Sequence, residues 1–303
     1  MNYLKAEVEN TYAETFEGLY CRVIVTAENH EILLEAAEHS TATPSIVVGR
    51  TEGGVEEWLN SANTPDGRQG AVLQFWSGID EKKPIEESVD RFEAELSIRI
   101  RQDILVKPFT ALFDASIQAI GELDMMDRVG HCGDGYEWEE LRHGRNVIIV
   151  PLMVPDFVIE RRLGYAKGIM GANFWYMCTT KESVITAGKK ALDAINAVRG
   201  VIAPFGVCSA GSKPETKYPS IGPTTNHPYC PSLKARLKKE SAVPDGVTYI
   251  PEVVINGVSL EAVMEAMKLG IEAIRTVQGV HLISAGNYGG ILGKEKIWLR
   301  DLL

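Results

Sequence analysis

The pattern of hydrophobic and polar positions between residues 251 and 294 predicts a strand, a helix, a second strand and a glycine-rich loop. Residues 251–255 have the short β-branched pattern of a strand. Apolar side chains then recur at helical spacing, at Leu260, Val263, Met267, Ile271, Ile274 and Val277. Residues 280–284 favour a strand again, and residues 285–290 break the pattern. Because the segment that leaves each strand of a βαβ unit builds the edge of a site, we expect half of a functional site here.

A similar unit occurs earlier, with a strand predicted at 173–178 and a helix over 183–198. Gly200-Val201 then matches Gly279-Val280 at an offset of 79 residues (279 − 200). Both copies go on to the tripeptide Ser-Ala-Gly, at 209–211 and 284–286. The match between the helices is apolar periodicity that any two amphipathic helices share, but the repeated short motifs indicate an internal duplication.

The first half of the chain is predicted to hold two more βαβ units in series. Strands are expected at 21–27, 45–49, 71–76 and 103–106, and helices from residue 32, over 85–96 and over 109–120. The second half opens with strands at 146–151 and 157–161. The connection over 211–247 is rich in Pro, Gly, Lys and Thr, and loops of this length inside compact domains are usually functional.

Two βαβ units in each half favour an α+β fold of two ferredoxin-like split βαβ sandwich lobes, residues 1–150 and residues 151–303. The length of 303 residues suits two domains. The main alternative is a single doubly wound parallel sheet. That fold would be expected to carry Gly-x-Gly-x-x-Gly after the first strand, and the sequence has no such motif there.

Charge and cysteine content narrow the class of protein. With 31 Lys and Arg against 41 Asp and Glu, the net charge of −10 argues against binding to nucleic acid or to an anionic membrane surface. The sequence has no apolar run of 18 residues, its start is too polar for a signal peptide, and its five cysteines include no Cys-x-x-Cys. We therefore expect a cytoplasmic protein. His227-x-x-Cys230 alone is too weak to predict a metal site.

Glu252 is the strongest candidate for chemistry. Strand alternation places it on one face with Val254 and Asn256, while Val253 and Ile255 lie on the other. A carboxylate that shares a face with an apolar side chain is partly desolvated, which raises its pKa toward the range useful for general acid–base catalysis. The same pattern also fits a solvent-facing carboxylate at a strand edge.

Other candidates lie in loops and at strand starts, where each also has an ordinary structural explanation. Asp134 lies in Gly-Asp-Gly-Tyr, which is a common turn, and Asn173 follows Gly171-Ala172 at a strand start. Loop amides followed by a lysine can hold an anion, and solvated lysines are equally ordinary. The candidates of this kind are Ser212, Lys213 and Lys294. Thr225 and Asn226 lie in a segment dense in short polar groups, and Asn287 and Tyr288 lie within the glycine loop.

Several catalytic motifs are missing from the sequence. No Gly-x-Ser-x-Gly surrounds a serine nucleophile, because Val207 stands two residues before Ser209. The chain has no Walker loop, so no step driven by ATP is evident. Cys208 could act as a nucleophile, but no neighbouring histidine supports it.

Taken in this order, the motifs resemble those of the formylmethanofuran:tetrahydromethanopterin formyltransferase family over nearly the whole chain. Besides Glu252 in its strand, they are Thr64-Pro65-Asp66-Gly67-Arg68, Phe113-Asp114-Ala115, Gly133-Asp134-Gly135-Tyr136, Asn173-Phe174, Gly211-Ser212-Lys213, Thr225-Asn226, Tyr229-Cys230-Pro231 and residues 284–290. The sequence departs from the family pattern at 100–103, at Ala172, and at 206–208, where the family has Pro-Gly-Gly.

The resemblance implies formyl transfer between the two soluble carriers formylmethanofuran and tetrahydromethanopterin, without metal or other cofactor. It implies a homodimer or homotetramer, an acid–base role for Glu252, and substrate binding by residues that include Tyr136. The carriers bear carboxylates and a phosphate, for which Lys213 and Lys294 are the candidate partners. Two alternatives remain open: a related chain that has lost turnover and serves as a carrier-binding or structural subunit, and a formyl hydrolase.

Overall fold

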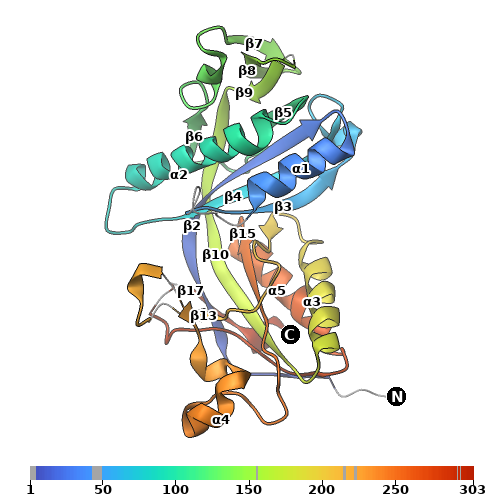
Figure 1. Cartoon of the computed structure of the whole chain (residues 1–303), viewed down its shortest axis with the longest axis vertical. Helices are drawn as coiled ribbons and strands as arrows, with labels where there is room; N and C mark the ends of the chain where they lie inside the picture. The colour runs from blue at the N-terminus through green and yellow to red at the C-terminus, as the bar shows by residue number, and fades with distance from the viewer. Residues whose placement is uncertain are drawn as a thin grey trace. The chain divides into compact units, whose positions relative to one another are not determined.

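The computed structural model describes residues 5–42, 50–154, 156–213, 216–221, 224–291, 293 and 295–303 (Figure 1). Contacts divide the chain into two compact units. One unit consists of Glu17–Gly168, and the other combines Met1–Phe16 with Ile169–Leu303. The predicted division into residues 1–150 and 151–303 stays a prediction. The long strands β2 (Tyr12–Ala27) and β10 (Arg162–Cys178) each contribute residues to both units.

The unit Glu17–Gly168 has the βαββαβ order of a ferredoxin-like fold. Its six elements are β2, α1 (His30–Thr41), β3 (Glu52–Leu59), β4 (Gln69–Gly78), α2 (Ile85–Arg99) and β5 (Thr110–Asp114). The strands are antiparallel in the order β5–β2–β4–β3. Alternate strand residues such as Val23 and Val25 pack with α1 and α2 in the core.

Four further strands extend this unit: β6 (Gly121–Asp124), β7 (Trp138–Arg142), β8 (Arg145–Pro151) and β9 (Asp156–Glu160). The strand β9 pairs with β5 in parallel, and β8 and β7 follow in antiparallel order. The predicted strands at 146–151 and 157–161 are confirmed.

Two predictions around residue 105 are wrong. The expected strand at 103–106 is instead part of a π-helical turn, Ile100–Leu105, that continues α2. The expected helix over 109–120 contains β5. Ile104 is buried among the core residues of the helices, whereas Leu112 and Phe113 are buried on opposite faces of a strand. A short apolar run fits a helix or a strand equally well, and for this reason the predicted strand proved to be helical and the predicted helix proved to contain a strand. The predicted strand at 45–49 lies outside the described residues.

The second unit repeats the same topology. Its elements are the second half of β10, α3 (Lys181–Ile195), β11 (Val201–Ile202), β15 (Glu252–Gly257), α5 (Leu260–Ile274) and β16 (Val280–Ser284). The strands run antiparallel in the order β16–β10–β15–β11. Both units therefore have the predicted ferredoxin-like fold. β12 (Val207–Cys208) also pairs with β15, β1 (Glu7–Val8) pairs with β16, and β17 (Glu295–Trp298) pairs with β2.

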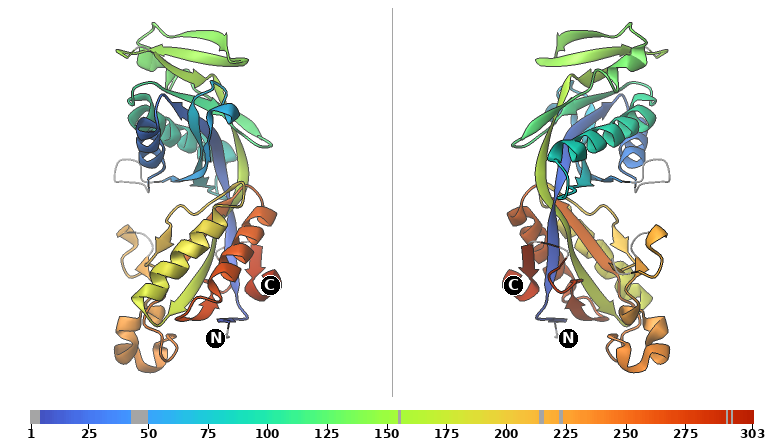
Figure 2. Two further views of the ribbon diagram at one scale, coloured as in Figure 1. Left: turned by 90° about the vertical axis from the view of Figure 1, so that its right-hand side faces the viewer. Right: turned by 90° about the vertical axis from the view of Figure 1, so that its left-hand side faces the viewer.

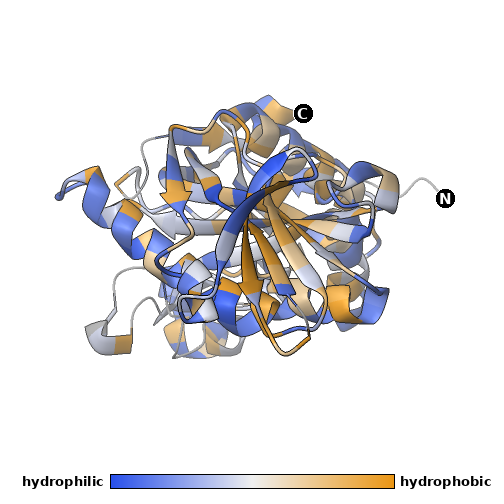
Figure 3. Ribbon diagram, turned by 90° about the horizontal axis from the view of Figure 1, so that it is seen from above, coloured by the Kyte–Doolittle hydropathy of each residue, from blue (hydrophilic) through white to orange (hydrophobic). Residues whose placement is uncertain are grey.

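Helices α3 and α5 lie side by side on one face of this sheet (Figure 2). Each begins at a side-chain cap: the hydroxyl oxygen of Thr180 accepts from the amide of Ser183, and that of Ser259 accepts from the amide of Ala262. Such a cap stabilises a helix by about 1 kcal/mol. In Figure 3 the hydrophobic colour gathers on the strands, while the helices carry both colours. The helices thus bury one apolar stripe against the sheet and expose the opposite side.

The predicted duplication corresponds to the two βαβ halves of this unit, β10–α3–β11 and β15–α5–β16. Gly200 and Gly279 both follow the helix of their half, with φ of 84° and 90°. A side chain at either position would be strained in this left-handed region. The shared Gly-Val pair therefore marks the same turn from helix to strand in both halves.

Candidate active site

The candidate site lies on the sheet face opposite α3 and α5. Strand alternation sends Phe174, Val253 and Ile255 toward the helices, where they are fully buried. Glu252 stands opposite Trp175 in the pairing of β15 with β10, so both side chains are on the other face. The predicted alternation around Glu252 is confirmed.

Glu252 is a buried carboxylate, with 7% of its surface exposed. The Nε1–H of Trp175 donates to its Oε1 at 3.0 Å, and Cys208 stands directly opposite it in the pairing of β12 with β15. Burial raises the pKa of Glu252 above its usual value, and the neighbouring donors Trp175 and Cys208 act in the opposite direction. The alternative of an exposed carboxylate at a strand edge is therefore wrong. Both edges of β15 are paired, one with β10 and the other with β11 and β12.

Trp175 connects Glu252 to a pocket of about 340 Å³ within the same unit. The pocket wall comes from β10, from α3 and from the long connection between β12 and β15. Its lining residues are Trp175, Val184, Ser209, Ala210, Gly211, Thr225, Asn226, Tyr229, Cys230, Pro231, Ser232, Thr248, Tyr249, Ile250 and Pro251. Glu252 follows Pro251 directly in the chain, and its partner Trp175 forms part of the wall. The carboxylate is thus one side chain away from the pocket.

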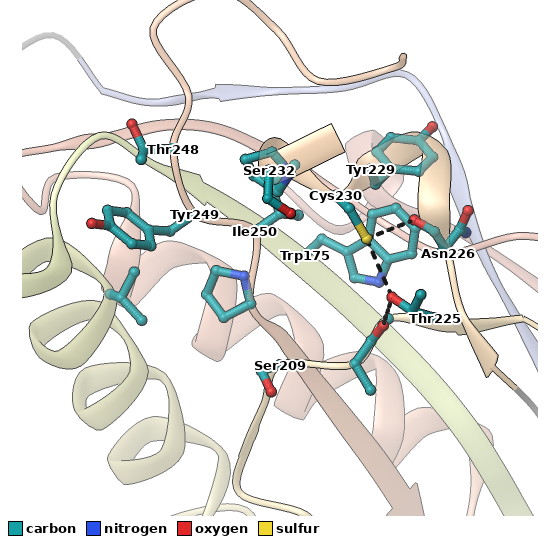
Figure 4. Close-up of a pocket in the computed structure, with 15 residues that line it drawn as sticks. Trp175, Ser209, Thr225, Asn226, Tyr229, Cys230, Ser232, Thr248, Tyr249 and Ile250 are labelled. Atoms are coloured by element: carbon teal, nitrogen blue, oxygen red, sulfur yellow. Dashed lines mark hydrogen bonds between the residues drawn. The ribbon is translucent and has the colours of Figure 1, made fainter. Parts of the chain in front are cut away.

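The long connection is folded over this pocket (Figure 4). The Cys230 sulfur lies 3.3 Å from Oγ1 of Thr225 and 3.7 Å from the carbonyl oxygen of Asn226. Tyr229 packs edge-on against Trp175 with ring centroids 4.6 Å apart. Burial, followed by the nearby charge of Glu9, raises the pKa of Tyr229. Three aromatic residues, Trp175, Tyr229 and Tyr249, and several short polar groups therefore line one cavity, which is typical of a small-molecule site.

Asn173 holds the loop that follows β16. Its Oδ1 accepts from the amide of Gly286 at 2.7 Å, and its Nδ2 donates to the carbonyl of Gly286 at 3.3 Å. A Cβ at position 286 would lie 2.8 Å from Cζ2 of Trp175. Glycine is required there because the backbone passes directly against the indole. The side chain of Asn173 is engaged with protein backbone and orients the loop beside Trp175.

The glycine loop encloses a carboxylate that belongs to the protein. Glu14, on β2, is buried, and its Oε1 accepts from the amides of Tyr288 and Gly290 at 2.6 Å each. Its Oε2 accepts from the amide of Gly293 at 3.2 Å. The loop does gather amides around an anion, and in this structure that anion is Glu14. Asn287 donates from Nδ2 to Oγ1 of Thr11 at 2.9 Å.

The remaining predicted residues fall into three places. Ser212 and Lys213 form β13, which pairs with β14 (Thr224–Thr225), and the amide of Asn226 donates to the carbonyl of Gly211 next to that pair. Asp134 and Tyr136 belong to the unit Glu17–Gly168, where Asp134 has φ of 57° in an exposed turn. Lys294 lies outside the described residues.

Sequence reasoning did not single out Trp175 and Glu9. Trp175 follows Asn173 by two positions in one strand, so alternation could have placed it on the same face as that candidate residue. Glu9 is not part of any local sequence motif. Its Oε2 accepts a hydrogen bond from Oγ of Ser284 at 2.5 Å, and the two residues are 275 positions apart in the sequence. No pattern in the sequence indicates that pairing.

Among the described residues, no group of three or more His, Cys, Asp or Glu side chains comes together in a way that could hold a metal ion. None of the described helices is long and apolar enough to cross a membrane.

Comparison with known proteins gives one family over both halves of the chain. The model described as formylmethanofuran-tetrahydromethanopterin formyltransferase matches residues 1–152, and the model of its proximal lobe matches residues 155–302. A formylmethanofuran–tetrahydromethanopterin formyltransferase-like protein of Methanothermobacter thermautotrophicus is 56% identical over 98% of this chain and 97% of its own length. The formyltransferase of that organism is 39% identical over 98% of each chain. The solved formyltransferase of Methanosarcina barkeri superposes with a TM-score of 0.89 at 36% identity, over 100% of each chain.

Proposed function

The chain belongs to the formylmethanofuran–tetrahydromethanopterin formyltransferase family, and we propose that it transfers a formyl group from formylmethanofuran to tetrahydromethanopterin in one-carbon metabolism. The observation that carries this proposal is Glu252, a buried carboxylate of raised pKa that is hydrogen-bonded to Trp175, a residue of the pocket wall.

The reaction is acyl transfer between two nitrogen atoms. The amine of the acceptor attacks the formyl carbon, and the carbonyl oxygen becomes the oxyanion of a tetrahedral intermediate. The attacking nitrogen must lose a proton, and the leaving nitrogen must gain one. One carboxyl group with a pKa raised toward neutrality can accept the first proton and donate it to the second nitrogen. We assign this role to Glu252, and propose that the reaction needs no metal or other cofactor.

Substrate binding is assigned to the pocket and its surroundings. Trp175 and Tyr229 contribute aromatic rings to the pocket wall, and Thr225 and Asn226 contribute hydrogen-bonding groups. Lys213 is the candidate partner for an anionic group of a carrier, together with Lys294. Asn173, Ser212, Asn287 and Tyr288 are proposed to shape the carrier site, and Asp134 and Tyr136 to bind a carrier from the unit Glu17–Gly168.

We further propose a cytoplasmic homo-oligomer, a dimer or a tetramer. Closed symmetric assemblies are the common state of soluble oligomers, and sites for large ligands often form at domain or subunit boundaries. Light scattering at micromolar concentration should give a mass of at least two chains. A mass of about 33.3 kDa, that of one chain, would contradict this part of the proposal.

A second candidate function follows from the pattern of identities. The chain is closer to a formyltransferase-like protein (56% identical) than to the formyltransferase of the same organism (39% identical). A related chain that binds carriers without turnover, or a formyl hydrolase, would fit this pattern.

One assay separates the three functions. The purified chain is mixed with formylmethanofuran and tetrahydromethanopterin, and formation of the formylated pterin is followed by ultraviolet absorbance. Transfer requires both carriers, and direct transfer gives intersecting double-reciprocal lines. Formate release without the pterin would identify a hydrolase. Binding of both carriers by calorimetry with no product would identify a carrier-binding subunit. Parallel lines, or a formylated chain trapped without acceptor, would show a covalent intermediate and return Cys208 or Ser209 to consideration.

A further inference from the structure

Cys208 is placed beside the carboxylate of Glu252 by the sheet itself. The strand β12 pairs antiparallel with β15, and Cys208 stands directly opposite Glu252. Trp175 stands opposite the same residue from the other side, on β10. Side chains directly opposite each other in an antiparallel pair are close neighbours on the same face. Glu252 is therefore flanked in one row by an indole N–H and a thiol.

Cys208 accepts one hydrogen bond from the backbone and keeps its thiol proton available as a donor. The Cys208 sulfur accepts from the amide of Ala210 at 3.4 Å. The thiol proton is then free to be donated to the Glu252 carboxylate, which lies opposite Cys208 in the strand pair. The ionised carboxylate can only accept, so the indole and the thiol are both donors to it. Burial opposes the charged form of Glu252, whereas both donors favour it.

We propose that Cys208 is a positioning residue for Glu252: its thiol, together with the Trp175 indole, orients the carboxylate and favours its ionised form. This inference rests on the acid–base role assigned to Glu252 above. It explains how a carboxylate with so little solvent contact can still alternate between the two protonation states that proton transfer requires.

Few other titratable groups surround this row among the described residues. Tyr229 packs on Trp175, and Glu9 raises the pKa of Tyr229 in addition to burial. Val253 and Ile255 occupy the opposite face of β15 and carry no charge. The influences on the pKa of Glu252 are burial, which raises it, and the donors Trp175 and Cys208, which lower it. A substitution of Cys208 therefore changes the pKa of Glu252 without a second charged side chain that would mask the effect.

The test compares Cys208→Ala with Cys208→Ser, because the serine hydroxyl can still donate to the carboxylate. Thermal midpoints are measured from pH 4 to pH 9. Near pH 9, where Glu252 is ionised, the alanine variant should melt at least about 2 °C below the serine variant, since hydrogen bonds to charged groups are the strong ones. Near pH 4, where Glu252 is protonated, the difference should shrink below about 1 °C. In a Glu252→Gln background the gap between the two variants should not change with pH.

A purely structural role of Cys208 predicts a different result. Lost packing would separate the two variants by the same amount at every pH, with or without Glu252, and that outcome would overturn the proposal. Cys132→Ala, which removes an exposed thiol in the other unit, controls for loss of a cysteine as such.

Kinetics provide the second readout. If the chain transfers formyl groups, the midpoint of the kcat–pH profile should move upward by roughly half a unit or more in Cys208→Ala and should return in Cys208→Ser. An unmoved midpoint in Cys208→Ala would contradict the proposal while leaving formyl transfer intact. If the chain shows no transfer at all, the melting series still decides whether Cys208 acts on Glu252.

Discussion

The indole of Trp175 donates its Nε1–H to Oε1 of Glu252 at 3.0 Å, from the neighbouring strand of the same sheet. The same indole forms part of the pocket wall and packs against Tyr229. One side chain therefore contacts both the buried carboxylate and the space where a substrate would lie. A ligand that displaces Trp175 would also change the hydrogen bonding of Glu252.

Glu252→Gln should abolish most of the catalytic rate while preserving the fold. The two side chains are nearly isosteric, and the amide oxygen can still accept from Trp175. Loss of general acid–base catalysis should lower kcat by about 10²–10⁴-fold, with little change in KM. Initial rates over a range of both carriers provide the measurement. Glu272→Gln, an exposed carboxylate on α5, should change kcat by less than about threefold. A near wild-type kcat in Glu252→Gln would end the acid–base assignment.

The stability of the protein should depend on pH through Glu252. Its pKa is raised in the folded state, so the folded chain binds the proton more tightly than the unfolded chain. Stability from this group is then fully present below the usual pKa of 4.5 and is lost as the pH rises through the folded pKa. Glu252→Gln removes this loss. Its unfolding free energy relative to the wild type should therefore be higher at pH 8 than at pH 4, as measured by urea unfolding. An equal difference at both pH values would show that Glu252 titrates normally.

Gly286→Ala should disturb the site through contact alone. The new methyl group would lie 2.8 Å from Cζ2 of Trp175 and 3.2 Å from Oδ1 of Asn173. Overpacking of this kind costs about 1–3 kcal/mol, and we expect a loss of stability in this range together with lower activity. Gly78→Ala is the matched control, because a Cβ there meets no atom within 4 Å and the backbone is unstrained. Chemical denaturation of both variants should show a loss for position 286 only.

Glu14→Gln should release the glycine loop. The neutral amide offers one acceptor oxygen in place of two, so at least one of the amides of Tyr288, Gly290 and Gly293 loses its partner. Hydrogen bonds to a charged group contribute about 1.5–3 kcal/mol each, and we expect roughly 2–4 kcal/mol of destabilisation. Hydrogen exchange of these amides, read by mass spectrometry, should accelerate. Glu295→Gln, exposed on β17, should leave their exchange unchanged. Unchanged protection in Glu14→Gln would mean that the loop is held by other contacts.

The elements that the sequence predicted well are those with local signals. Alternation located the face of Glu252, and helical spacing of apolar residues located α3 and α5. The stretch from 100 to 114 was misassigned because isolated apolar residues there fit either period, and burial against the helices decided between them. The hydrophobic pattern of a short segment does not show which other segment of the chain packs against it and buries it.

The glycine loop shows the same limit at the candidate site. Its composition predicted a group of amides around an anion, and the amides are indeed gathered in that way. The anion is supplied by Glu14, which is 274 residues from Tyr288 in the sequence. Trp175 is a milder case, since strand alternation could have included it. Long-range pairs such as Glu14 with Tyr288 form only when the chain has reached its folded topology. The sequence of either segment alone therefore does not predict them.

The pairing of β2 with β17 has a consequence for synthesis on the ribosome. Residues 17–168 are contiguous, so that unit can fold as soon as it has left the exit tunnel. Tyr12 leaves the tunnel early, yet its strand partner Trp298 is among the last residues to be made. At about 5–20 residues per second, the nascent strand waits roughly 15–60 s for that partner. Throughout this time its edge is open to capture by a chaperone or by a neighbouring nascent chain.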